Sequence, residues 1–400
     1  MAKKYASVQQ VDFSTYKRVI AVSDIHGDSE SLAGVLEKVK FSKEDALVIV
    51  GDMTEKGVHS LEVIRMVMEY AKAGNVYALL GNNDALLLEW LEGEISDEGM
   101  HGYVMAKETG VIREMAQELG TAFESMEDFL ELKQKIQEAF AAEIQFLRNL
   151  PHIIDSEIAV FVHAGIEPGD LWQQDYEFCL AAPAFAKQKH HFEKLVIVGH
   201  WPVSNYCDEK IDANVYFNKE TNVISLDGGN SMKAWRQLNY LILYPENQKP
   251  DCLVDEREPV FQSNVSKSDK DVDIAEKSAM KSGYFDRLLK IRVLDSQRES
   301  KEALTLAFPN TRIEILQKGD DQSLCFVPYI NREMTVPNDR IYEYKQKTYR
   351  YDMTTYDLAV ESGEILSFCM ETEDGILAKR NGIVGNYRGR YEFVKEDSRE

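Results

Sequence analysis

Side chains that can bind metal ions follow several apolar runs of this sequence, each at the point where the run ends. Residues 19–22 lead to Asp24 and His26, one residue apart, before the chain turns at Gly27. Such runs are typical of buried strands, and the carboxyl ends of strands are where open α/β sheets bind their ligands. The same arrangement recurs four more times along the chain. The residues that follow these later runs are Asp52, Asn82, His163 and His200.

One strand that ends in an acid or a histidine is weak evidence, because Asp-x-His-Gly is also turn chemistry. Each histidine taken alone is more often a hydrogen-bonded core residue than a metal ligand. Five strands that end in this way within one chain favour a shared metal site. The histidines outside this pattern are interpreted as surface or structural residues: His59, His101, His152, His190 and His191.

The motifs around these residues resemble those of the calcineurin-like metallophosphoesterases. In chain order they are Ser-Asp-Ile-His-Gly-Asp, Gly-Asp-Met-Thr-Glu-Lys-Gly, Gly-Asn-Asn-Asp, Val-His-Ala-Gly and Val-Gly-His-Trp-Pro, within residues 17–245. The sequence is most similar to the phosphoprotein phosphatase branch and its bacterial relatives, which include small Ser/Thr phosphatases and symmetrical dinucleoside tetraphosphatases. The resemblance implies an α/β (α+β) sandwich of central β-sheets flanked by helices, and a phosphoric ester hydrolase.

The resemblance also implies a centre with two divalent metal ions. Asp24 and His26 would bind the first ion, and Asp52 would bridge the two. The remaining ligands of the second ion would be Asn82, His163 and His200. This mixed oxygen and nitrogen set suits manganese best, with iron or zinc as alternatives. Two ions about 3.5–4 Å apart clamp a phosphoryl group and lower the pKa of a bound water to roughly 7, so that hydroxide attacks.

Three positions depart from the phosphatase pattern. Asn83 stands where the family has an acid histidine, so Glu55, at the position of the acid that orients this histidine, is freed from that role. Lys56 replaces a phosphate-binding arginine, and lysine lacks the bidentate fork of arginine. Glu55 or Asp84 could serve as the general acid instead, and Lys56 and Asn83 remain candidates to bind substrate. Residues 164–199 contain no arginine, and the candidates to replace the second arginine of the family are Lys187, Lys189 and Lys194.

These departures leave three hypotheses for the function. General acids contribute typically 10²–10⁴-fold, and their loss matters most for poor leaving groups such as a serine alkoxide. The first hypothesis is a phosphatase for phosphomonoesters, with phospho-Ser/Thr proteins among its substrates. The second is a hydrolase of nucleotides or dinucleoside polyphosphates. The third is a weakly active, metal-binding interaction module.

The chain is expected to divide into two domains joined by a linker. Residues 1–245 form the metallophosphoesterase domain, interrupted at 85–150 by a helical insertion. This insertion is interpreted as a cap that shapes access to the site, rather than as a partner-binding helix. Residues 246–284 are rich in proline and polar residues and indicate a linker. Residues 285–400 predict a small β-barrel-like domain, similar to bacterial SH3-like barrels or a generic β unit, that could bind a protein or peptide; Asn381 and Gly382 predict a hairpin turn.

Composition limits the partners and the location. The net charge of −22 argues against nucleic acid or an anionic membrane as the main partner. A phosphorylated substrate can still bind, because metal ions invert the local field. No run of eighteen apolar residues occurs, so no membrane span is expected, and the first residues lack the apolar core expected of a signal peptide. Its 5 cysteines are widely spaced, which favours a reducing cytoplasm.

Overall fold

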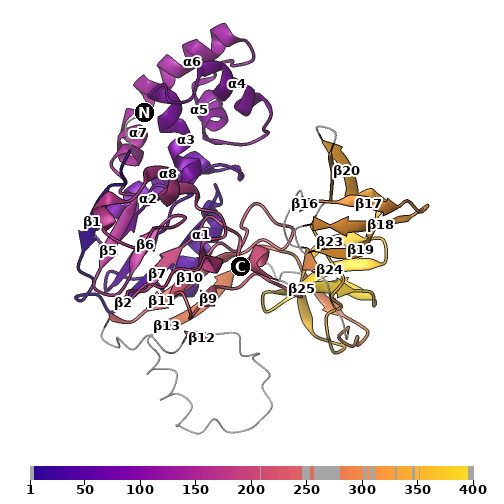
Figure 1. Cartoon of the computed structure of the whole chain (residues 1–400). Coiled ribbons are helices and arrows are strands. Elements are labelled where there is room, and N and C mark those ends of the chain that lie inside the picture. The colour runs from indigo at the N-terminus through magenta and orange to yellow at the C-terminus, as the bar shows by residue number, and fades with distance from the viewer. Residues whose placement is uncertain are drawn as a thin grey trace. The chain divides into compact units, whose positions relative to one another are not determined.

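The structure, a computed structural model, contains two compact units (Figure 1). The first comprises Met1–Val203 and Asn214–Arg287, and the second comprises Ser204–Ala213 and Leu288–Glu400. The structure describes residues 4–207, 209–245, 253–255, 280–300, 303, 305–306, 311–328, 331–344, 347–350 and 352–394. Among these residues, no helix combines the length and the apolar character needed to cross a bilayer.

Two six-stranded sheets form the centre of the first unit. The strands of one sheet are, in spatial order, β12 (Leu253–Asp255), β13 (Met280–Phe285), β11 (Leu238–Leu243), β2 (Arg18–Val22), β3 (Asp45–Ile49) and β4 (Val76–Ala78). Those of the other are β1 (Val8–Val11), β5 (Ile153–Ser156), β6 (Val160–Val162), β7 (Val196–Val198), β10 (Val223–Ser225) and β9 (Tyr216–Asn218). The five apolar runs are therefore strands, namely β2, β3, β4, β6 and β7.

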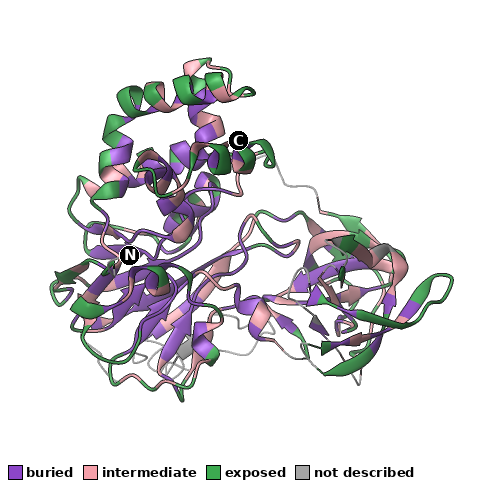
Figure 2. Ribbon diagram, turned by 45° about the horizontal axis from the view of Figure 1, so that its top comes forward, coloured by how far each residue is buried: buried purple, intermediate pink, exposed green. Residues whose placement is uncertain are grey.

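The two sheets pack face to face because the strand side chains alternate between two cores. Val19 of β2 packs in a buried cluster with Phe161 and Ile197 of the second sheet. Its neighbour Ile20 points to the opposite face and packs in a second cluster with the helices. These helices include α1 (Ser29–Lys38) and α2 (Ser60–Ala71). This arrangement confirms the predicted α/β fold, whose strands are largely buried whereas the helices of the insertion carry many exposed residues (Figure 2).

The parallel direction of these strands brings their carboxyl ends to one edge of each sheet. Strands β2, β3 and β4 are mutually parallel, and β6 is parallel to β7 in the other sheet. The carboxyl ends of parallel strands meet at the same edge of a sheet. The candidate ligands that follow these strands are therefore presented together.

The insertion is helical, as predicted. It contains α3 (Asn82–Leu91), α4 (Asp97–Met105), α5 (Val111–Leu119), α6 (Met126–Ala139) and α7 (Ala141–Arg148). One apolar face of α6 and α7 is buried in the same cluster as Ile20: Phe129, Leu132, Ile136, Phe140, Ile144 and Leu147. Shorter elements follow in the first unit, namely η1 (Leu171–Gln173), α8 (Tyr176–Ala181) and η2 (Phe185–Lys187).

The predicted linker, residues 246–284, falls mostly outside the described residues. Its described stretches, however, are strand residues rather than linker. They belong to β12 and β13, and β13 pairs antiparallel with β11 and parallel with β12. Gly283 of β13 lies against Tyr240, since a Cβ there would be 2.3 Å from the tyrosine Oη. The sequence Met-Lys-Ser-Gly-Tyr-Phe lacks the apolar alternation of a typical strand, so this pairing was not expected.

The second unit is rich in strands, as predicted. Its largest sheet has the order β26 (Tyr391–Phe393), β14 (Lys290–Val293), β23 (Ile365–Thr372), β24 (Gly375–Arg380), β25 (Ile383–Tyr387) and β8 (Ile211–Asp212). The others are β15 (Thr305–Leu306), β16 (Thr311–Arg312), β17 (Glu314–Gln317), β18 (Gln322–Val327), β19 (Arg332–Pro337), β20 (Ile341–Tyr344), β21 (Lys347–Arg350) and β22 (Met353–Thr354), with the short helix η6 (Asn338–Arg340). Asn381 and Gly382 have positive φ and join β24 to β25, which confirms the hairpin. The helix η3 (Val203–Tyr206) leads from the first unit toward β8, so a segment placed in the first domain by the sequence supplies a strand here.

Candidate metal centre

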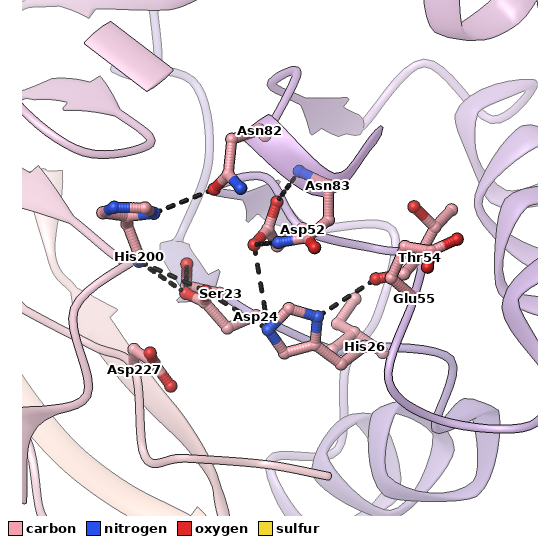
Figure 3. A network of polar contacts seen from close by, with 12 residues as sticks. Ser23, Asp24, His26, Asp52, Thr54, Glu55, Asn82, Asn83, His200 and Asp227 are labelled. Carbon is pink, nitrogen blue, oxygen red and sulfur yellow. Dashed lines mark hydrogen bonds and ion pairs between the residues drawn. The ribbon is translucent and has the colours of Figure 1, made fainter. Parts of the chain in front are cut away.

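Two groups of candidate ligands meet at the carboxyl edge of the sheets and share one carboxylate. Asp24, His26 and Asp52 offer ligand atoms that all lie within 4.8 Å of one another, and so do Asp52, His163 and His200. Asp52 therefore stands between the two groups (Figure 3).

Asn82 joins the second of these groups. Its Oδ1 lies 3.0 Å from Nε2 of His163 and 2.8 Å from Nδ1 of His200. The structure thus brings together the residues that the sequence proposed as ligands.

The turns that present these side chains are conformationally strained. Asp24, His26, Asp52 and His200 have φ values of 56°, 51°, 53° and 65°. Non-glycine residues seldom adopt this left-handed region, and such strain persists where the surrounding structure imposes it, often at functional sites. The surrounding structure therefore holds these side chains so that they face a common point. The strained backbone that this requires costs stability.

Glycines allow the ligand loops to approach one another. A Cβ on Gly81 would lie 2.2 Å from both N and Oδ1 of Asp52. One on Gly199 would lie 2.2 Å from Oδ2 of Asp24. Both distances are far below van der Waals contact, so the Gly-Asn and Gly-His motifs need their glycines for close packing rather than for a turn alone.

Backbone carbonyls orient two of the histidines. Nδ1 of His26 lies 3.0 Å from the carbonyl oxygen of Thr54, and Nδ1 of His163 lies 2.9 Å from that of Val50. Donation from Nδ1 leaves Nε2 of each ring for a metal ion, which is the usual arrangement of metal-binding histidines.

The spacing of the remaining ligand atoms fits bound cations. Nε2 of His26 lies 3.7 Å from Oδ2 of Asp52 and 3.8 Å from Oδ1 of Asp24. Nε2 of His163 lies 3.4 Å from Oδ1 of Asp52. Ligand atoms at about 2.0–2.2 Å from one ion are separated by roughly 3–3.6 Å, close to these values. Carboxylate, amide and imidazole ligands around two such points suit divalent ions.

The electrostatics of the centre also favour a cation. Asp24, Asp52 and Asp227 are buried acids. Burial raises the pKa of Asp24, and the charge of Asp227 raises it further. Burial also acts to raise the pKa of Asp52, but the neighbouring His163 outweighs this effect and holds that pKa below its usual range. Several buried carboxylates close together are stabilised when a cation lies between them.

The candidate catalytic residues Asn83 and Asp84 are held in hydrogen bonds to neighbouring groups and are not free to act as a general acid. Asn83 donates hydrogen bonds to both oxygens of Asp52, from N at 2.8 Å and from Nδ2 at 2.6 Å. The carboxylate of Asp84 accepts hydrogen bonds from the backbone N–H groups of Met53, Thr54 and Gly81. Asn83 and Asp84 are thus engaged in holding the loops that carry Asp52 and Asn82.

Glu55 is directed into the insertion. Its Oε2 accepts a hydrogen bond from Oη of Tyr103 at 2.8 Å, and its Oε1 accepts one from N of Val111 at 3.0 Å. Burial raises the pKa of Glu55. Among the lysines considered as substitutes for an arginine, Lys194 is bound to Asp155 at 2.6 Å.

Sequence reasoning missed three residues near the centre. Asp227 follows β10 just as the other acids follow their strands, so the same pattern could have identified it. Tyr103 and Lys107 come from the insertion, and their positions depend on long-range packing that no local motif signals.

Residues 17–226 match the calcineurin-like phosphoesterase family. The symmetrical bis(5'-nucleosyl)-tetraphosphatase of Mannheimia succiniciproducens is 30% identical over 150 residues, which cover 37% of this chain and 44% of the relative. The asymmetrical bis(5'-nucleosyl)-tetraphosphatase PrpE of Halalkalibacterium halodurans is 27% identical over 159 residues, which cover 38% of this chain and 58% of the relative. The chain thus spans about half the length of these curated relatives. A protein serine/threonine phosphatase from Saccharomyces cerevisiae with similarity to human phosphatase PP5 aligns with 71% of this chain and 85% of its own, at 13% identity and a TM-score of 0.40.

Substituting Gly81→Ala is expected to reduce metal binding while leaving the chain folded. The added Cβ would displace the Asp52 carboxylate, which it approaches to 2.2 Å. Loss of ligand geometry should weaken metal affinity by about 10–100-fold. Metal content after dialysis against a weak chelator measures this effect. The control Gly102→Ala adds a methyl group where nothing lies within 4 Å, so its metal content should not change. Equal metal content in both variants would contradict the packing argument.

Proposed function

Because the chain belongs to the calcineurin-like phosphoesterase family, whose members use dinuclear metal centres, we propose that it is a metal-dependent phosphohydrolase acting on phosphomonoesters. The observation that supports this most is the position of Asp52, shared by two groups of ligand residues. Phospho-Ser/Thr proteins are among the candidate substrates, and manganese is the proposed metal.

In the proposed centre, Asp24 and His26 hold one divalent ion, and Asn82, His163 and His200 hold the other. Asp52 contributes to both. When bound, such a pair of ions supplies Lewis acidity toward a phosphoryl group and lowers the pKa of a water molecule. The task of the protein is to fix these ligands, and the carbonyl oxygens of Thr54 and Val50 do so for two of the histidines.

Asn83 is proposed as a positioning residue for Asp52 rather than an acid. Its two hydrogen bonds hold both carboxylate oxygens, and an amide cannot protonate a leaving group. Glu55 and Asp84 are engaged by other groups, which argues against either as the acid. Leaving groups that need no proton should therefore react best, such as aryl oxides. Lys56 is proposed to bind the substrate phosphate.

A second candidate function is hydrolysis of nucleotides or dinucleoside polyphosphates. The two relatives described above are named as bis(5'-nucleosyl)-tetraphosphatases, and a phosphate leaving group also needs little acid assistance. Turnover of a phosphopeptide and of diadenosine tetraphosphate, compared at equal metal loading, separates the two candidates.

A third candidate, a weakly active interaction module, is distinguished by metal binding without turnover. For the second unit, an SH3-like barrel and a peptide ligand remain predictions, as does a cytoplasmic location.

Substituting Asp52→Asn is expected to abolish turnover of an aryl phosphate with added manganese. The amide removes the charge shared by both metal sites, so activity should fall by more than about a hundredfold. Circular dichroism should show a folded chain. Asp12→Asn is a matched control, because Asp12 is exposed and should leave the rate unchanged. Turnover that persists in the Asp52 variant would contradict its assignment as the shared ligand.

Substituting Asn83→His tests whether the missing acid limits the substrate range. A histidine at this position could protonate a poor leaving group, so hydrolysis of a phosphoserine peptide should rise by up to about 10²-fold. Hydrolysis of an aryl phosphate should change much less, because its leaving group needs no proton. Steady-state rates on both substrates measure the difference. An equal gain or loss on both would indicate that Asn83 acts only through Asp52.

A further inference from the structure

The end of α4, the start of α5 and the turn between them are attached to the loop after β3. Tyr103 and Val111 donate hydrogen bonds to the carboxylate of Glu55, at 2.8 and 3.0 Å. Thr109 donates from Oγ1 to the carbonyl oxygen of Lys56 at 3.0 Å. This part of the insertion is therefore held beside the loop that carries Asp52.

Two further contacts anchor the same helices. The carboxylate of Glu114 in α5 accepts hydrogen bonds from N of Ser60 at 2.8 Å and from N of Leu61 at 2.7 Å, at the start of α2. Arg65 of α2 forms an ion pair with Glu118 of α5 at 2.8 Å. These contacts tie α5 to α2, so this part of the insertion is held against the core of the first unit.

These attachments bring together two lysines. Lys107 lies just after α4, with Nζ 5.4 Å from the centre of the Tyr103 ring. Burial lowers the pKa of Lys56, and the charge of Lys107 lowers it further, while Asp52 and Glu55 act in the opposite direction. Because Tyr103 binds the carboxylate of Glu55 and Thr109 binds the carbonyl oxygen of Lys56, Lys107 lies on a segment that is held beside Lys56.

The ammonium groups of both lysines remain available to a ligand. Within the described part of the chain, no hydrogen bond or ion pair involves Nζ of Lys56 or of Lys107. Acids outnumber bases in this protein by 68 to 46, so partners are abundant, and adjacent unpaired ammonium groups are costly. An anionic ligand between them would relieve that repulsion, as phosphate groups do at lysine-containing sites.

We propose that Lys107 and Lys56 form a second anion subsite, which binds the phosphate group next to the one that is cleaved. The substrates it favours are phosphate anhydrides, such as nucleoside polyphosphates or inorganic polyphosphate. The inference rests on the proposed phosphohydrolase activity, because the subsite has this role only if phosphoryl transfer occurs at the neighbouring metal centre. It favours the second candidate function, hydrolysis of polyphosphates, over hydrolysis of phosphomonoesters. Lys107 acts as a specificity residue that the insertion supplies, and it compensates for the arginines absent from the core.

The test is the substitution Lys107→Gln in the full chain, with manganese, on an aryl phosphate, inorganic tripolyphosphate, ATP and diadenosine tetraphosphate. Loss of a charged contact to phosphate should raise KM for the three polyphosphates by about 10–100-fold. KM and kcat for the aryl phosphate, which has no second phosphate, should change by less than about twofold. Lys107→Arg should restore most of the affinity. Lys135→Gln is the matched control, since Lys135 lies in the insertion and pairs with Glu131 in α6.

The proposal of a subsite would be overturned if Lys107→Gln raised KM equally for the aryl phosphate and the polyphosphates, or changed neither. A rise in KM confined to ATP and diadenosine tetraphosphate would also overturn the subsite, because Lys107 would then contact the nucleoside rather than phosphate. If the unsubstituted protein hydrolyses none of the substrates, the proposed function fails, and calorimetric binding of tripolyphosphate still tests the subsite. Weaker binding in Lys107→Gln by about tenfold or more would support it, and unchanged binding would overturn it.

Discussion

The arrangement of this site depends on the carboxylate of Asp52. Asn83 donates to both of its oxygens, and His26 and His163 approach it from opposite ligand groups. An ionised carboxylate buried in this way is stable only with compensating positive charge and hydrogen bonds. Two neighbouring loops of one sheet are shaped around this carboxylate, since Gly81 leaves space for it and Asp84 joins the loops that follow β3 and β4.

The chemistry of the proposed centre follows from what these residues can and cannot do. Metal ions held by the two ligand groups would neutralise charge on a phosphoryl group, whereas Asn83 cannot donate a proton to a leaving group. The protein is thus better equipped to hold phosphate than to assist departure of an alkoxide. Within the first unit, the insertion adds Tyr103 and Lys107 beside the loop after β3, and the proposed subsite would make substrate selection depend on an element outside the sandwich core.

Much of the fold could be predicted from the sequence because its signals are local. Apolar runs that end in Asp24, Asp52 or His163 identify both the strands and the edge where they meet. The features of the fold and the site that could not be predicted depend on contacts between segments that are distant in the sequence. The strand β13 pairs with β11, where Gly283 lies against Tyr240, and β8 pairs with β25 in the second unit. The engagement of Glu55 by Tyr103 likewise joins residues 48 positions apart, beyond any motif.

The central claim is that two metal ions share Asp52. Electron paramagnetic resonance of the manganese-loaded protein tests it most directly, because ions joined by a carboxylate at about 3.5–4 Å are magnetically coupled. At saturation the account predicts the spectrum of a coupled manganese pair, which is lost in Asp52→Asn. A spectrum of isolated manganese ions at saturation would contradict the account, because it would mean that the two groups of ligands do not form one centre.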